Sequence, residues 1–159
     1  MGKKGREIVG LDIEDLVNSL NQALANEWQS FYQYWLAAHV VTGEGALGLS
    51  EQLRKIALQE MDHADELAKR ILQLGGMPLT NPREWAAAAS CAYVEPPENP
   101  ADLKQIIKDG ADAEVCAIEF YNKLANKVFN KDSVTYQIVV RLLAQEVEQE
   151  DAFDDMLPR

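Results

Sequence analysis

Glutamate recurs in the same pattern in the two halves of this chain. Glu27 is followed 33 positions later by Glu60, and Glu114 is followed 32 positions later by Glu146. All four lie on apolar stripes repeated at helical spacing, and no segment shows the alternation typical of a β-strand. Helices of this kind bury their stripes by packing against one another. The repeat therefore predicts an all-α fold, a bundle of four long helices with one of these glutamates on each.

Breaks in the helical pattern place the four helices. The first is expected from about Asp12 to Val41 and the second from Ser50 to Leu74. The third is expected to begin near Pro100 and to continue to Val128, and the fourth to begin at Asp132 or Ser133.

The connection between the second and third helices, residues 76–100, is long and rich in proline. It contains an alanine-rich stretch, residues 86–89, that is compatible with a short helix. A crossover of this length lets the third helix start at the same end as the second, which predicts an up-down-down-up bundle. We expect a single domain over residues 1–159, with a flexible tail at residues 1–10 and no fifth helix.

The composition narrows the class of protein. No apolar run approaches the roughly 18 residues of a membrane span, and the N-terminus leads into no signal-peptide core. We therefore expect a cytoplasmic protein without a membrane partner. The net charge of −11 opposes nonspecific binding to nucleic acid and favours the attraction of cations. Two cysteines are too few for a secreted disulfide framework.

The second glutamate of each half opens a short motif: Glu60 is followed three positions later by His63, and Glu146 by Gln149. Burying ionised carboxylates is costly unless they are paired, and His63 is the only basic residue clearly on a stripe. Two divalent metals would balance four carboxylates, and oxygen ligands with imidazole suit iron or manganese better than structural zinc. The candidate metal ligands, which are also the candidate catalytic residues, are Glu27, Glu60, His63, Glu114 and Glu146.

At these residues the chain resembles the ferritin-like superfamily, whose motif is two glutamates and two Glu-x-x-His pairs. Within it, the chain is similar to the Dps-like proteins called thioferritins. Their signature is a cysteine at the end of the crossover and another on the third helix, which here would be Cys91 and Cys116. The resemblance implies two iron ions per subunit, with manganese also open, and a homo-oligomeric cage, a dodecamer. It also implies Fe(II) and either hydrogen peroxide or dioxygen as the substrates.

The second half departs from the family pattern at Gln149, where histidine is expected. Glutamine can ligate a metal through its carbonyl oxygen, but it is a weaker donor than imidazole. Glu150, one residue further on, is the alternative ligand. In either case we expect the second metal position to be more labile than the first.

The two cysteines and two tyrosines each allow two interpretations. From the residues alone, Cys91 and Cys116 are typical of independent buried side chains. The resemblance favours a disulfide, either to exchange electrons with peroxide or to tie the crossover to the third helix. Tyr34 and Tyr121 stand seven positions, about two turns, after the first glutamate of each half. We interpret them as packing residues that hold a ligand carboxylate through their hydroxyl groups, with a redox role as the alternative.

Three functions are compatible with these features of the sequence. The preferred one is a ferroxidase that oxidises Fe(II) with peroxide or dioxygen, stores the product in a cage and so protects against oxidative stress. The alternative is a manganese catalase or di-iron peroxidase without iron storage. The third is a non-enzymatic helical adaptor, which would have no use for four buried carboxylates, or a DNA-coating protein of the Dps kind. DNA binding is disfavoured because such proteins use a lysine-rich tail, whereas this N-terminus has only Lys3, Lys4 and Arg6.

Overall fold

The chain folds into helices joined by loops in the computed structural model, which describes residues 2–157. The four long helices are α2 (Ile13–Val40), α3 (Ala46–Leu74), α5 (Leu103–Val128) and α6 (Ser133–Met156). The short elements are α1 (Lys4–Glu7), a 3-10 turn at Pro82–Glu84 and α4 (Trp85–Ala88). The described part contains no strand, which confirms the all-α prediction. The predicted count of four helices covers only the long ones, because α1 and α4 are additional.

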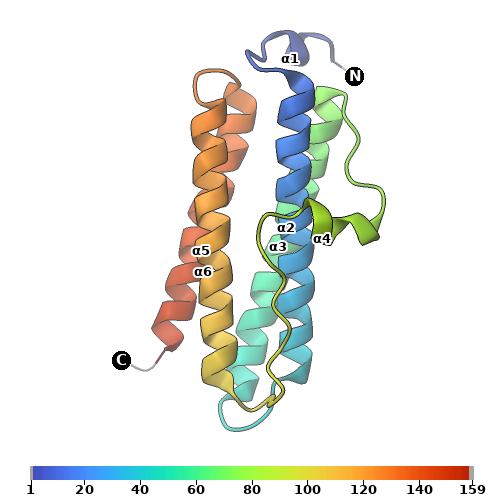
Figure 1. Ribbon diagram of the computed structural model, residues 1–159. Helices are drawn as coiled ribbons and strands as arrows, with labels where there is room; N and C mark the ends of the chain where they lie inside the picture. Colours follow the sequence, from blue (N-terminus) through green and yellow to red (C-terminus); the bar gives the residue numbers. More distant parts are fainter. Residues whose placement is uncertain (1, 158–159) are drawn as a thin grey trace.

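The long helices form an up-down-down-up arrangement (Figure 1). Helices α2 and α6 run in one direction, and α3 and α5 run in the other. The crossover that carries α4 descends along the outside of the bundle and brings the chain to the start of α5. Of the described helices, none is both long and apolar enough to cross a bilayer.

Aspartate side chains begin three of the long helices. Asp12 accepts a hydrogen bond from the backbone N–H of Asp15 (2.8 Å), and Asp102 accepts one from Gln105 (3.1 Å). Asp132 accepts from the first backbone N–H groups of α6. These carboxylates satisfy donors that have no partner within the helix, and they favour the positive end of its dipole.

Helix α3 begins four residues earlier than the predicted start at Ser50. Gly45 precedes it with a φ of 83°, a left-handed conformation that glycine adopts without strain. Ser50 lies inside the helix, where its hydroxyl donates to the carbonyl oxygen of Ala38 near the end of α2 (2.6 Å). The serine therefore connects two helices instead of capping one.

The N-terminal segment predicted to be a flexible tail contains the short helix α1. The segment also contacts the bundle, since Gly10 donates its backbone N–H to the carbonyl oxygen of Lys131 (2.7 Å). Arg6 lies against Gly75 at the end of α3. Met1, which belongs to the same predicted tail, and residues 158–159 fall outside the described part of the chain.

The apolar core is divided into two clusters along the bundle. One cluster gathers the first half of α2, the second half of α3, the end of α5 and the start of α6, and includes Leu20, Leu67 and Leu142. The other fills the opposite end and includes Leu53 and Phe153. Between the two clusters, each long helix contributes polar side chains to the interior. The fold therefore places a polar layer in the middle of an apolar bundle.

Candidate metal centre

The polar layer contains all of the ligand candidates predicted from the sequence except Glu150. The four glutamates and His63 each retain at most 2% of their accessible surface, and Gln149 retains 3%. We call this set the ligand belt: Glu27 on α2, Glu60 and His63 on α3, Glu114 on α5, and Glu146 and Gln149 on α6. Isolated carboxylates are almost never buried this deeply, so the belt requires a compensating partner.

His63 lies at the centre of the contacts within the belt. Its Nδ1 atom is 3.2 Å from Oε2 of Glu27, 3.1 Å from Oε1 of Glu146 and 3.9 Å from Oε2 of Glu60. One ligand atom from each of these four residues, His63 and the three glutamates, lies within 4.8 Å of the others. At this spacing, all four residues could coordinate a single metal ion. On the opposite side of the ring, Nε2 donates to Oε1 of Gln145 (3.1 Å).

The two tyrosines pair with the glutamates crosswise. The hydroxyl group of Tyr34, on α2, donates to Glu114 on α5, and that of Tyr121, on α5, donates to Glu27 on α2. Both tyrosines are 1% exposed. Each first glutamate is therefore held by a residue from the opposite hairpin, which fixes its orientation inside the bundle.

Gln149, and not Glu150, belongs to the buried layer. Glu150 is partly exposed, whereas Gln149 is buried one helical turn after Glu146. Neither Oε1 nor Nε2 of Gln149 has a hydrogen-bond partner in the described protein. The placement favours Gln149 over Glu150 as the second-half ligand, and ligation itself remains a prediction.

Several oxygens of the belt lack hydrogen bonds in the described protein. They are Oε1 of Glu60, both carboxylate oxygens of Glu146 and Oε1 of Gln149. Of these, Oε1 of Glu146 has the ion contact with Nδ1 of His63 but no hydrogen bond. Buried acceptors of this kind carry a desolvation cost unless a partner is supplied. A divalent cation is such a partner, and the donor set of carboxylate oxygens, one amide oxygen and one imidazole fits iron or manganese. The residues present therefore fit the metals that the motif implies.

Burial and mutual repulsion change the pKa values of the belt. Burial, followed by the charges of the other carboxylates, raises the pKa of Glu60 and of Glu146 well above the usual value. Burial raises the pKa of Glu114 to about 7. Burial alone would raise the pKa of Glu27 and lower that of His63. The contact between the two side chains outweighs burial, so that the pKa of Glu27 is lowered and that of His63 is raised to about 9. Without metal, the belt therefore holds protons at neutral pH.

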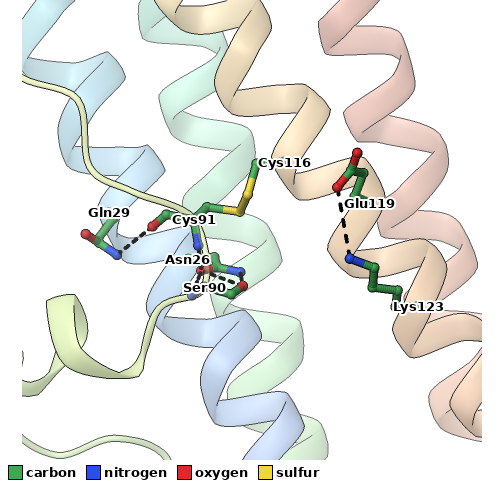
Figure 2. The surroundings of a disulfide bond; sticks show 7 residues. All are labelled: Asn26, Gln29, Ser90, Cys91, Cys116, Glu119 and Lys123. Atoms are coloured by element: carbon green, nitrogen blue, oxygen red, sulfur yellow. Dashed lines mark hydrogen bonds and ion pairs between the residues drawn. A yellow bond between two sulfur atoms is a disulfide. The ribbon is translucent and has the colours of Figure 1, made fainter.

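The crossover is attached to two ligand-bearing helices, α2 and α5 (Figure 2). A disulfide joins Cys91 of the crossover to Cys116 of α5, which follows Glu114 by two residues. On α2, the residue next to Glu27 is Asn26, whose Oδ1 accepts from the backbone N–H groups of Ser90 (2.9 Å) and Cys91 (3.1 Å). The geometry agrees with the tie between crossover and third helix that the resemblance implied.

Two residues near the belt were not singled out from the sequence. Gln145 contacts His63, and its signal was the repeated Gln-Glu pair, since Gln59 precedes Glu60 as Gln145 precedes Glu146. Asn26 carried no such signal, because only the folded crossover provides its partners. His39, the other histidine of the chain, is exposed, and its Nδ1 lies 2.6 Å from the carbonyl oxygen of Trp35.

Comparison with known proteins identifies the fold family. Residues 17–159 match the ferritin-like domain. The chain belongs to the ferritin-like family. It is 33% identical to the DNA protection during starvation protein of Pyrococcus furiosus over 151 residues, which cover 95% of this chain and 81% of that one. It is 27% identical to the bacterioferritin of Brucella melitensis over 144 residues, which cover 89% and 82% of the two chains.

Solved ferritin-like structures agree with this assignment. The dodecameric thioferritin of Bacteroides fragilis, a bacterioferritin-related protein, has a TM-score of 0.91 and 33% identity, with 97% of this chain and 92% of that one covered. The bacterioferritin of Desulfovibrio desulfuricans has a TM-score of 0.78 at 23% identity, covering 98% and 82%, and shows the fold alone. The resemblance to ferritin-like and thioferritin proteins is therefore confirmed.

Proposed function

We propose that this chain is a ferroxidase and iron-storage subunit that oxidises Fe(II) at a two-metal site in the ligand belt. The observation that carries the proposal is the group of buried carboxylate oxygens that have no hydrogen-bond partner in the described protein. A structural polar layer would satisfy its own acceptors, whereas a site for cations must leave them free. Membership of the ferritin-like family supports the same chemistry.

In this proposal the belt provides two metal positions. Position 1 is formed by Glu27 and His63, and position 2 by Glu114 and Gln149. Glu146 comes from the second half but lies in the cluster around His63, which supports a role for it between the two positions. By the internal repeat, we assign the same role to Glu60.

The protein residues manage charge and protons during binding. The raised pKa values of Glu60 and Glu146 favour their protonated forms in the metal-free belt, and Fe(II) binding would favour release of these protons, because a divalent cation stabilises the ionised form. Tyr34 and Tyr121 keep the two first glutamates oriented throughout. Gln145 accepts from Nε2 of His63, which leaves Nδ1 to face the metal.

Either hydrogen peroxide or dioxygen can accept the electrons that Fe(II) supplies. Two Fe(II) ions supply one electron each, and one hydrogen peroxide takes both electrons and two protons to give two waters. Transfer of the electrons as a pair avoids hydroxyl radical, so the same step detoxifies the peroxide. With dioxygen, the first two-electron step would yield peroxide instead.

We assign the oxidised iron to the interior of a homo-oligomeric, dodecameric cage in the cytoplasm. The dodecameric thioferritin of Bacteroides fragilis, at 33% identity, supports this assembly. The net charge of −11 supports the attraction of Fe(II) and disfavours DNA as a partner. The protection named for the Pyrococcus furiosus relative would then be chemical in this chain, through removal of Fe(II) and peroxide.

A manganese catalase or di-iron peroxidase without storage is the second candidate, and the oxygen-rich second half with Gln149 favours it. Anaerobic titration with Fe(II), followed by peroxide or air, separates the two functions when particle mass is followed by light scattering. Two irons per chain, rapid oxidation and excess iron retained in a large particle support the ferroxidase. Sustained peroxide disproportionation without consumption of Fe(II) supports the catalase.

The assignment of the belt predicts the behaviour of Glu60→Ala. Loss of this carboxylate should slow Fe(II) oxidation by about 100-fold or more, since even the outer partners of metal ligands are typically worth about 10–100-fold. The metal-free variant should keep its helical circular dichroism, because the change deletes a buried ionisable group. Glu51→Ala, at an exposed position of the same helix, is the control and should oxidise Fe(II) normally. Normal oxidation kinetics in Glu60→Ala would contradict the site.

A further inference from the structure

The two halves of the ligand belt differ in the chemistry of their donors. The internal repeat pairs Glu27 with Glu114 and His63 with Gln149. Position 1 therefore offers an imidazole nitrogen, whereas position 2 offers oxygen donors only. The difference cannot be attributed to a displaced side chain, because His63 and Gln149 are equally buried, at 2% and 3% exposure.

The protein contacts at position 1 bring its nitrogen and oxygen donors together. His63 contacts Glu27 at 3.2 Å and Glu146 at 3.1 Å through Nδ1. Gln145 holds the other side of the ring through Nε2. Imidazole favours metals such as Fe(II), Co(II) and Zn(II), so a fixed nitrogen donor raises the affinity of this position for them.

Position 2 has a neutral oxygen donor in place of the nitrogen. Oε1 of Gln149 is buried without a hydrogen-bond partner in the described protein, although an amide oxygen in a core normally accepts one. Glu114, the other member of this position, is held by Tyr34. Carboxylate and carbonyl oxygens are the donors preferred by hard cations such as Mn(II) and Mg(II).

We propose that the belt is a site for two different metals, with a nitrogen-favouring cation at position 1 and a hard, readily exchanged cation such as Mn(II) at position 2. This inference rests on the proposed two-metal site. Gln149 is its determinant. In iron handling, position 2 is then the place at which ions enter and leave, while position 1 retains its ion.

The test loads the metal-free, full-length protein with one equivalent of Zn(II) and an excess of Mn(II). Anomalous diffraction at the zinc and manganese absorption edges then locates each ion in the crystal, without any turnover. Calorimetric titration with Zn(II) alone measures the two binding steps in solution. We expect zinc confined to position 1, manganese at position 2, and two Zn(II) steps that differ by about tenfold or more.

Gln149→His is the decisive variant. It should distribute zinc over both positions and bring the two Zn(II) steps within a few-fold of each other. Glu150→Gln tests the alternative ligand, and Glu148→Gln is the exposed control on the same helix. We expect both to behave as the unaltered protein does.

The results separate failure of this inference from failure of the proposed function. Zinc shared equally between the positions in the unaltered protein, or unchanged titration steps in Gln149→His, overturns the two-metal preference and leaves the two-metal site intact. A loss of the weaker step in Glu150→Gln overturns the role of Gln149. Absence of any ion from the belt overturns the proposed function together with the inference.

Discussion

Arg70 is a buried cation that lies outside the ligand belt. It is 3% exposed, and its guanidinium donates to Oδ2 of Asp132 (2.7 Å) and to Oγ1 of Thr135 (2.8 Å). Asp132 also begins α6 by accepting backbone N–H groups. The carboxylate of Asp132 therefore caps α6 and is also the counter-ion of Arg70 on α3.

Removal of one member of this pair should be costly. We expect Arg70→Met to lower the free energy of unfolding by about 3–5 kcal/mol, because Asp132 would be left buried and unpaired. The double change Arg70→Met with Asp132→Asn should recover much of that loss, since asparagine keeps the cap without the charge. Urea unfolding of the metal-free proteins measures both values. Equal stability of the single and double variants would contradict the ion-pair explanation.

Single residues also show what could be predicted for the site. The spacing of Glu27, Glu60, Glu114 and Glu146 was sufficient to predict one layer, because the helical period places each of them on the apolar face of its helix. The crosswise pairing of Tyr34 with Glu114 could not be predicted in this way. It depends on how the two hairpins are rotated against each other, which the sequence of one helix does not specify.

At the scale of the helices, α5 and α6 are in close contact where Gly110 meets Phe153. A Cβ atom on Gly110 would lie 2.5 Å from Cε1 and Cζ of the Phe153 ring. That ring is fully buried and also packs against Tyr34, with 5.7 Å between the ring centroids. The glycine therefore allows a ring to pack directly beside the helix that carries Glu114.

Two glycine substitutions should change the free energy of unfolding in opposite directions. Gly110→Ala should lower the free energy of unfolding by about 1–3 kcal/mol through overpacking, despite the better helix propensity of alanine. Gly48→Ala, in α3, should raise it by up to about 1 kcal/mol, because nothing lies within 4 Å of its new methyl group. Thermal unfolding of the metal-free variants compares them. Stabilisation by Gly110→Ala would contradict the close approach of Phe153.

The helix boundaries were predictable where a side chain acts on its own helix. Asp12 and Asp132 cap the helices whose starts were expected there. The start of α3 was wrong by four residues because Ser50 bonds to the carbonyl oxygen of Ala38 on another helix. Helix α1 was not predicted, since four residues carry too little periodicity to be distinguished from a tail.

At the scale of the whole molecule, the belt makes the metal-free fold sensitive to pH. The raised pKa of Glu114, about 7 compared with 4.5, contributes stability that is complete below pH 4.5 and is lost as pH rises through 7. His63, raised from 6.5 to about 9, contributes stability that is complete below pH 6.5 and is lost as pH rises through 9. Glu60 and Glu146 have the same sign as Glu114, whereas Glu27, with a lowered pKa, loses its contribution only on acidification.

The metal-free protein should therefore unfold at progressively lower temperature between pH 5 and pH 9. Protein loaded with Mn(II) should not show this decline, because protons and metal compete for the same oxygens and the metal gains as protons leave. Differential scanning calorimetry in a chelating buffer, with and without the metal, measures both profiles. A metal-free melting temperature that is constant or rises over this range would contradict the protonated belt.

The bond between Cys91 and Cys116 also changes how the chain is connected. It closes a covalent ring that contains the last part of the crossover and the first half of α5. A protease that cuts within this ring leaves one covalent molecule, in which the two helical hairpins are still joined through sulfur. A cut at the exposed Arg83, outside the ring, divides the chain into two separate polypeptides. In the oxidised protein, cleavage in one segment of the crossover leaves the two fragments covalently linked, whereas cleavage in the other segment separates them.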